Sequence, residues 1–180
     1  MNITTIGRGN IGGGLARLWE RAGHNVTTLG HEGGDASGAD VVLVAVPGGS
    51  ASDALAKVSG LEGKIAIDTE NAFSGRNERY ESFAHEVKAR TNGPVAKAFN
   101  ANFAALYDRI GEVQARPGCL YAAEDEAREV TEQLIRDAGY EPVSLGGIEN
   151  ARALEDFVPG VLGKIEVGRT FYRFAPPDEF

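Results

Sequence analysis

The sequence predicts an α/β fold built on a doubly wound, mostly parallel sheet. Three observations lead to this fold class. Short apolar strands alternate with helical segments from the first residues onward. A glycine motif of the form G-x-G-x-x-G follows the first strand. An almost unbroken apolar run at 40–47 is typical of a central parallel strand that is buried on both faces.

The first half of the chain predicts a regular strand–helix alternation. Residues 2–6 form the first strand, and the helix after the glycines ends at Gly23, a residue type favoured just past a helix end. The elements that follow are a strand at 26–29, a loop at 30–38, the strand at 40–47, a helix at 51–59, a strand at 64–68, a helix at 76–90 and a strand at 95–99. This order implies right-handed crossovers between parallel strands.

The second half is less regular. The predicted elements are a short helix at 101–110, a strand at 118–122, a helix at 124–138 and a strand at 140–145. From Asn150 onward apolar residues recur at helical spacing, and Pro159 is expected to kink or break that helix. We therefore expect a dinucleotide-binding domain over 1–145 and a small C-terminal helical elaboration over 146–180, packed on the same domain.

Composition narrows the class of partner. The 180 residues carry a net charge of −8, which argues against a nucleic-acid partner. No apolar stretch reaches the length of a membrane span, and a strand that starts at residue 2 leaves no room for a signal peptide. The single Cys119 cannot form an internal disulfide and is expected to be a buried thiol. A cytoplasmic protein with small-molecule partners is the expectation.

The glycine motif predicts dinucleotide binding. Gly7 permits a tight turn, Gly9 lets the backbone approach a pyrophosphate, and Gly12 lets the helix pack closely on the sheet. The free N–H groups at the start of the helix and the helix dipole then hold the phosphates. A glycine-rich turn with no ligand is the alternative.

The end of the second strand favours NADP over NAD. NAD-selective folds carry an acid there for the ribose hydroxyls, but this strand ends in Gly30 and His31. His31 and Arg8 are both placed to approach a 2′-phosphate, although Glu32 would restore an acid if the register shifted by one residue. A solvated loop histidine is the competing interpretation of His31.

The sequence shows no recognisable pattern of catalytic acids, nucleophiles or metal ligands. Asp68 ends a parallel strand at the edge where ligands bind, but a cap or turn role is at least as well supported. Hydride transfer between two rings requires orientation and water exclusion more than an acid or base. Reduction of an imine or carbonyl would need a proton donor, for which Tyr107, Asn100 and Asp68 are the candidates.

Five segments together resemble the NADPH-dependent coenzyme F-420 reductases. They are residues 7–12, Val42–Pro47, Ile65–Asp68 with Asn71, Lys97–Asn100 and Gly147–Arg152. The resemblance extends to about residue 165 and implies hydride transfer between NADPH and a deazaflavin ring. It also implies that residues 9–11 hold the pyrophosphate, 30–31 face the adenosine ribose, 46–47 border the nicotinamide ribose and 98–100 lie at the nicotinamide.

These arguments predict an NADP-dependent oxidoreductase whose acceptor is coenzyme F-420 or a flavin. The alternatives are an NADPH-dependent reductase of a small imine or carbonyl and a non-enzymatic NADP-binding redox sensor. The predicted cofactor-binding residues are Gly7, Arg8, Gly9, Asn10, Ile11, Gly12, Gly30, His31, Val46, Pro47, Ala98 and Phe99. Asn100 is the predicted catalytic residue, acting as an anchor for a ring amide or carbonyl, and no metal site is expected. A homodimer through the apolar C-terminal helix is a further hypothesis.

Overall fold

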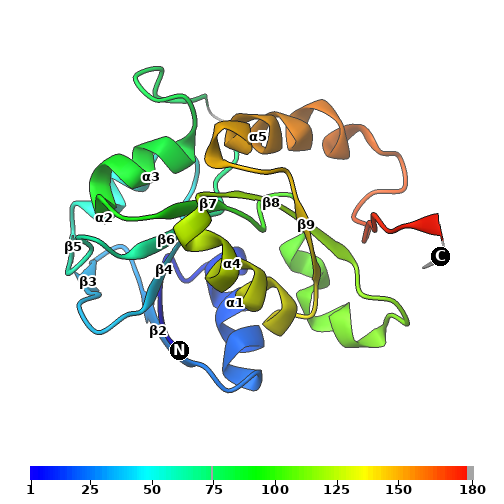
Figure 1. Ribbon diagram of the computed structural model, residues 1–180, viewed down its shortest axis with the longest axis horizontal. Coiled ribbons are helices and arrows are strands. Elements are labelled where there is room, and N and C mark those ends of the chain that lie inside the picture. Colours follow the sequence, from blue (N-terminus) through cyan, green and yellow to red (C-terminus); the bar gives the residue numbers. More distant parts are fainter. Residues whose placement is uncertain (74, 178–180) are drawn as a thin grey trace.

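The computed structural model describes residues 1–73 and 75–177. Its centre is a seven-stranded sheet in the order β2-β1-β4-β6-β7-β8-β9 (Figure 1). These strands are β1 (Asn2–Ile6), β2 (Asn25–Leu29), β4 (Val41–Val44), β6 (Ile65–Asp68), β7 (Val95–Lys97), β8 (Gly118–Ala123) and β9 (Glu141–Ser144). Two short strands, β3 (Gly34–Asp35) and β5 (Val58–Ser59), pair separately beside it.

The sheet is mostly parallel, as the sequence predicts. Strands β2, β1, β4, β6 and β7 run in the same direction, β8 is antiparallel to β7, and β9 is parallel to β8. The pairing places Ile6 opposite Val44, Val44 opposite Asp68, and Asp68 opposite Lys97. The carboxyl ends of four neighbouring strands therefore meet at one edge, which is where open α/β sheets bind ligands. The predicted doubly wound α/β fold is confirmed.

Helices cover both faces of the sheet (Figure 1). The helices are α1 (Asn10–Arg21), α2 (Ala51–Leu55), α3 (Phe83–Thr91), α4 (Asp125–Asp137) and α5 (Ala151–Gly160), with the 3₁₀ helices η1 (Ala104–Glu112), η2 (Ile148–Asn150) and η3 (Leu162–Lys164). Side chains of α1, α4 and η1 form the core on one face, and those of α2 and α3 form the core on the other. On the first face the buried Trp19 indole N–H donates to the backbone oxygen of Leu134, at 2.8 Å, which ties α1 to α4.

Several elements are shorter than the sequence predicts. The segment predicted as a helix over 51–59 stops at Leu55, because the following residues form β5 and pair with β3. The segment predicted as a helix over 76–90 starts only at Phe83, where Ser82 caps the helix by accepting the backbone N–H of His85. Residues 104–112 form a 3₁₀ helix in place of the helix predicted over 101–110.

The C-terminal helix packs inside the chain. Leu154 of α5 lies against Leu120 and Ala122 of β8, and Pro159 is accommodated in its last turn. The sheet therefore covers Leu154, whereas Val161 and Ile165 of the same apolar set are 49% and 38% exposed, and the homodimer stays a prediction. The division into domains over 1–145 and 146–180 stays a prediction, and residues 178–180 lie outside the described residues.

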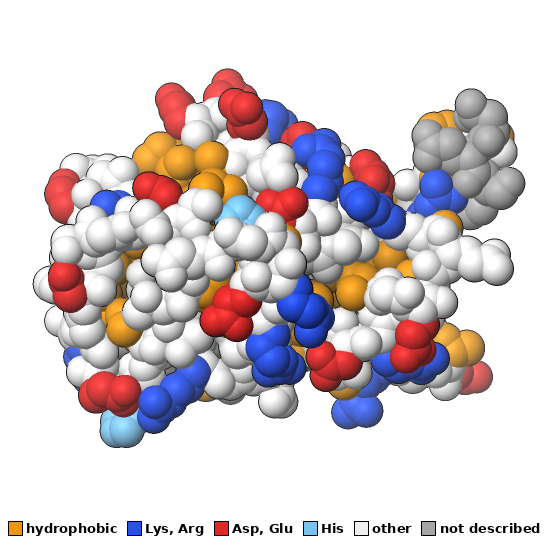
Figure 2. Space-filling model, turned by 90° about the horizontal axis from the view of Figure 1, so that it is seen from below, with side chains coloured by type: hydrophobic (Ala, Val, Ile, Leu, Met, Phe, Trp, Pro, Cys, Tyr) orange, Lys and Arg blue, Asp and Glu red, His pale blue; other side chains and the backbone are white. Residues whose placement is uncertain are grey.

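The surface carries charges of both signs. Acidic and basic side chains are intermingled on the face shown in Figure 2, with apolar side chains exposed between them. Within residues 1–73 and 75–177, no helix has the length and apolar character needed to cross a membrane. The same residues contain no cluster of His, Cys, Asp and Glu suited to a metal ion.

A buried ionic cluster lies at the edge of the sheet. The Nζ atom of Lys97, which is fully buried, lies 2.6 Å from Asp68 Oδ2 and 3.3 Å from Glu155 Oε1. It also donates to the backbone oxygen of Glu70, at 2.5 Å. Glu155 accepts from the Arg76 side chain, at 2.7 Å, and from the Phe83 N–H, at 2.9 Å. The cluster therefore fastens β6, β7, the 69–82 loop and α5 to one another.

The cluster also contains a carboxyl group without a hydrogen-bond partner. Both side-chain oxygens of Glu70 are buried and make no hydrogen bond to described residues. Burial, together with the nearby Asp68, raises the pKa of Glu70 to about 9, so this carboxyl group is protonated at neutral pH. Asp68, Glu155 and the more exposed Asp156 then face the two cations Lys97 and Arg76, so protonation of Glu70 keeps a further negative charge out of the cluster.

We expect Lys97→Met to lower the free energy of unfolding by about 3–5 kcal/mol, because Asp68 and Glu155 would remain buried without the cation that pairs with them. Urea unfolding measures the change. Lys88→Met is the matched control, since Lys88 is 44% exposed and pairs with Glu124 near the surface. That variant should lose less than about 1 kcal/mol. Equal losses in the two variants would contradict a structural role for the cluster.

Candidate functional site

Two adjoining cavities lie along the carboxyl edge of the sheet. One, of about 490 Å³, extends toward α5 and the C-terminal segment, and we call it the ring cavity. The other, of about 430 Å³, lies beside β2 and α2, and we call it the ribose cavity. Both are lined by Gly9, Ala45, Val46 and Pro47. The shared wall makes them one continuous groove across the end of β4.

The glycine turn between β1 and α1 has the close contacts expected of a dinucleotide-binding turn. Gly7 has a φ of +104°, and a Cβ atom there would lie 2.2 Å from the backbone oxygen of Ala45. A Cβ atom on Gly12 would lie 1.9 Å from the backbone oxygen of Gly7. At Gly9, in contrast, a Cβ atom would meet nothing within 4 Å. Gly7 and Gly12 are thus required by the fold, whereas Gly9 leaves open space on the groove side.

The start of α1 has N–H groups available for an anion. No side chain caps this helix, and its first turn contains no acidic residue. The Gly13 N–H makes a bond to the Gly9 oxygen, at 2.8 Å, so the N–H groups before it have no partner within the helix. These groups and the helix dipole suit a pyrophosphate. The residues present therefore fit a dinucleotide at this turn.

The ribose cavity is lined by basic side chains. Arg8, His31 and Lys57 all line it, and Lys57 donates to the His31 backbone oxygen, at 3.1 Å. Glu32 lies next to them, with its carboxylate 3.6 Å from Arg8 Nη1 and 3.2 Å from His31 Nδ1. Asp53 also lines this cavity. Lys57, which the sequence analysis missed, adds a third basic group where a 2′-phosphate would lie.

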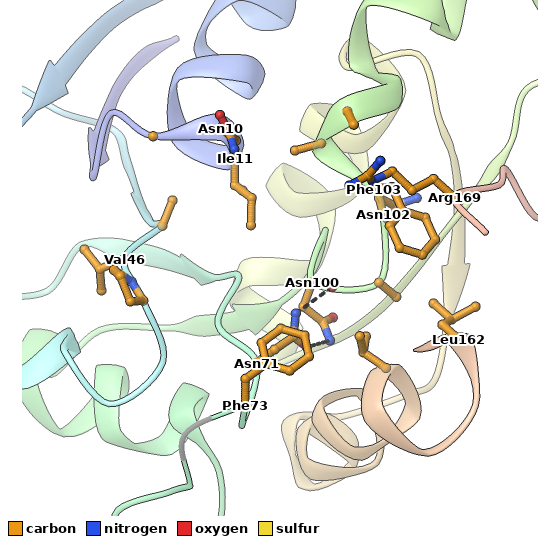
Figure 3. Close-up of a pocket in the computed structure, with 17 residues that line it drawn as sticks. Asn10, Ile11, Val46, Asn71, Phe73, Asn100, Asn102, Phe103, Leu162 and Arg169 are labelled. Atoms are coloured by element: carbon orange, nitrogen blue, oxygen red, sulfur yellow. Dashed lines mark hydrogen bonds between the residues drawn. The ribbon is translucent and has the colours of Figure 1, made fainter. Parts of the chain in front are cut away.

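In the ring cavity Asn100 is held by Asn71 and α5 (Figure 3). The Asn100 Nδ2 group donates to Asn71 Oδ1, at 3.0 Å, and to the Leu154 backbone oxygen, at 2.9 Å. Asn71 Nδ2 donates in turn to the Asn100 backbone oxygen, at 2.8 Å. Backbone oxygens only accept, so these bonds fix the orientation of both amides. The Asn100 N–H groups are therefore used within the protein, and only its Oδ1 atom has no partner.

The residues just before Asn100 lie in the core. Ala98 and Phe99 are fully buried and line neither cavity, unlike the sequence-based expectation that they contact the cofactor. Phe99 packs edge-to-face on Trp19, with ring centroids 5.8 Å apart. Its φ of +61° is in the left-handed region, which is unusual for a bulky residue. This turn sends the Phe99 ring into the core and brings Asn100 to the cavity.

The remaining predicted residues divide between the two cavities. Gly7, Arg8, Gly9, Gly30, His31, Val46 and Pro47 line the ribose cavity, and Gly9, Asn10, Ile11, Val46, Pro47 and Asn100 line the ring cavity. Gly12 lines neither and lies buried under the turn.

The ring cavity lacks a proton donor. Of the candidates for that role, Tyr107 and Asp68 are buried and do not line it. Burial also raises the pKa of Tyr107 well above its usual range. Among the described residues that line the cavity, Arg169 is the only titratable side chain. Cys119 is buried as predicted, and its pKa is raised by burial, so it is not a nucleophile.

Sequence analysis missed residues that reach the groove from distant segments. They are Lys57, Asn71, Phe73, Asn102 and Arg169. Asn71 follows a strand end, which is a usable signal, but Phe73 and Arg169 lie in irregular segments where no local pattern indicates a site.

Comparison with known proteins supports the fold. No protein-family model matches the chain, and no curated protein sequence matches it. A candidate F-420-dependent NADP reductase from Arthrobacter sp. FB24 has a similar structure, with 22% identity, a TM-score of 0.79 and coverage of 97% of this chain and 99% of that one. An imine reductase from Pseudomonas sp. is 18% identical, with a TM-score of 0.62 and coverage of 90% and 62%.

A reductive aminase from Aspergillus terreus, whose structure contains NADPH, is 12% identical, with a TM-score of 0.63 and coverage of 90% and 61%. This chain therefore spans less than two thirds of the length of the imine reductase and the aminase. The likenesses place it in the Rossmann-type fold of reductases and dehydrogenases.

Gly9→Val is expected to abolish dinucleotide binding and to leave the fold intact, because a side chain there enters open space that the pyrophosphate needs. Calorimetric titration with NADPH measures binding, and thermal unfolding monitors the fold. Gly38→Val is the matched control, since a Cβ atom at Gly38 also meets nothing within 4 Å and Gly38 lies outside the groove. Unchanged NADPH affinity in Gly9→Val would contradict the assignment of the groove.

Proposed function

We propose that the protein is an NADP-dependent oxidoreductase that transfers a hydride between NADPH and a deazaflavin, coenzyme F-420, or a flavin. The observation that carries this proposal is the groove itself. It joins an uncapped helix start and three basic side chains at one end to a ring cavity at the other, where Arg169 is the only titratable group among the described lining residues. A site of this kind suits transfer between two rings that need orientation and no proton.

The protein's residues act by binding and orientation. The backbone at 9–11 would hold the pyrophosphate, and Arg8, His31 and Lys57 would bind the 2′-phosphate. Val46 and Pro47 would border the nicotinamide ribose. NADPH, when bound, supplies the hydride. Asn100 would act by fixing the shape of the ring cavity, because its N–H groups are used within the protein and its Oδ1 atom is buried.

Two candidate acceptors each have support from a similar structure. The Arthrobacter protein, similar over nearly its full length, is described as F-420-dependent. Reduction of an imine or carbonyl is the second candidate, favoured by the likeness to an imine reductase. That reaction needs a proton donor, and the only titratable residue in the described lining of the ring cavity is an arginine, a residue type that does not release its proton in proteins.

Other expectations remain proposals. A cytoplasmic location and a homodimer are proposed with this function. A redox sensor that binds NADP without turnover is a competing proposal. Activity with any hydride acceptor would contradict the sensor.

Transfer of the label from NADPH deuterated at the reacting C4 position tests the proposal. F-420, FMN and a cyclic imine are offered in turn, and loss of NADPH absorbance identifies the acceptor. With F-420 we expect deuterium on the ring carbon that receives the hydride. With FMN the hydride goes to a ring nitrogen whose N–D bond exchanges with water, so slower oxidation of the deuterated NADPH reports the transfer there. Oxidation of NADPH by the imine alone would contradict the proposal and support the second candidate.

We expect tighter binding of NADPH than of NADH, by about tenfold or more, since hydrogen bonds to charged groups contribute about 1.5–3 kcal/mol. Lys57→Ala should weaken NADPH binding and leave NADH binding unchanged, so NADH is the internal control. Calorimetry gives both affinities. Equal affinity of the wild-type protein for the two cofactors would refute a 2′-phosphate site.

A further inference from the structure

We propose that Arg169 selects an acceptor that carries a phosphate or carboxylate group on a planar ring. This inference rests on the proposed function and names the acceptor's chemistry. It assigns a specificity-determining role to the segment after η3, which lies beyond the part of the chain that the sequence motifs cover.

Arg169 is placed to bind an anion in the ring cavity. It extends from the C-terminal segment across Asn102 and Phe103 toward the cavity (Figure 3). None of the described residues forms a hydrogen bond or an ion pair with its side chain, and the cavity lining that the structure describes contains no acidic residue. Arg169 is solvent-exposed and is the one charged side chain in the described cavity lining, so its guanidinium is available to an anionic ligand.

The other walls suit a flat ligand. Phe73, which is 72% exposed, stands at the cavity with a ring face available for stacking. Asn102 is 8% exposed, and its Nδ2 group donates to the Gly118 backbone oxygen, at 2.9 Å. Its Oδ1 atom is buried without a partner, as is that of Asn100. Both asparagines line the cavity, although each Oδ1 atom is itself buried.

The chemistry of Arg169 sets the class of group that it binds. A guanidinium forms paired hydrogen bonds with two oxygens of a phosphate or carboxylate, which a neutral hydroxyl cannot match. Phe73 and the apolar walls would contact neutral parts of the ring. An acceptor with a ring and no anion should therefore bind more weakly than the same ring with one.

FMN and riboflavin provide the test, because they share one ring system and differ in a phosphate. Protein saturated with NADP⁺ is titrated with each flavin, and quenching of flavin fluorescence gives the affinities. We expect FMN to bind about tenfold or more tightly than riboflavin in the wild type. Arg169→Gln should remove that difference and leave riboflavin affinity unchanged. Lys164→Gln removes a like charge from the nearby η3, outside the cavity. This variant should retain the preference for FMN.

NADP⁺ affinity is measured first for every variant by calorimetry. Failure of the wild type to bind NADP⁺ contradicts the proposed function. Retained NADP⁺ binding with equal affinities for FMN and riboflavin, or with no binding of either, overturns the role of Arg169 alone. A preference for FMN that Arg169→Gln and Lys164→Gln reduce equally also overturns it, because overall charge would then account for the effect.

Discussion

The arrangement of the whole groove depends on the ion pairs of Lys97. This side chain is buried at the end of β7 and joins Asp68 at the end of β6 to Glu155 on α5. The two strands fix one side of the ring cavity, and α5 fixes the other. A buried charge requires oxygen atoms on several sides, and here these come from three separate segments. The cluster thus sets the position of the 69–82 loop, and with it Asn71 and Phe73.

A second constraint connects this cluster to Asn100 in the ring cavity. Asn100 follows Lys97 by three residues, and the left-handed turn at Phe99 aims it at the cavity. The amide of Asn71, one residue after Glu70, then holds the Asn100 amide. The ring cavity is consequently shaped by fixed hydrogen bonds. This favours a role in orientation and agrees with the lack of a proton donor among the described lining residues.

The sequence predicts the frame of the fold well because that frame follows from local patterns. The alternation of strands and helices, the helix after the glycines and the mostly parallel sheet all arise from apolar periodicity and turn chemistry. The predicted lengths of α2 and α3 were wrong. Helix α2 ends early because the residues after it form β5, which pairs with β3. Helix α3 begins late because its cap is Ser82. Ala98 and Phe99 were expected at the cofactor, but the backbone turn at Phe99 directs them into the core.

By itself, the sequence determined the parallel α/β sheet and the glycine turn, since each depends on residues close together in the chain. Tertiary structure alone decided how Lys97 is neutralised, which groups hold the Asn100 amide and which charged side chain lines the ring cavity. Those outcomes depend on contacts such as the one between Lys97 and Glu155, which are far apart in sequence. A charge or an amide can be satisfied by many partners, and only packing selects among them.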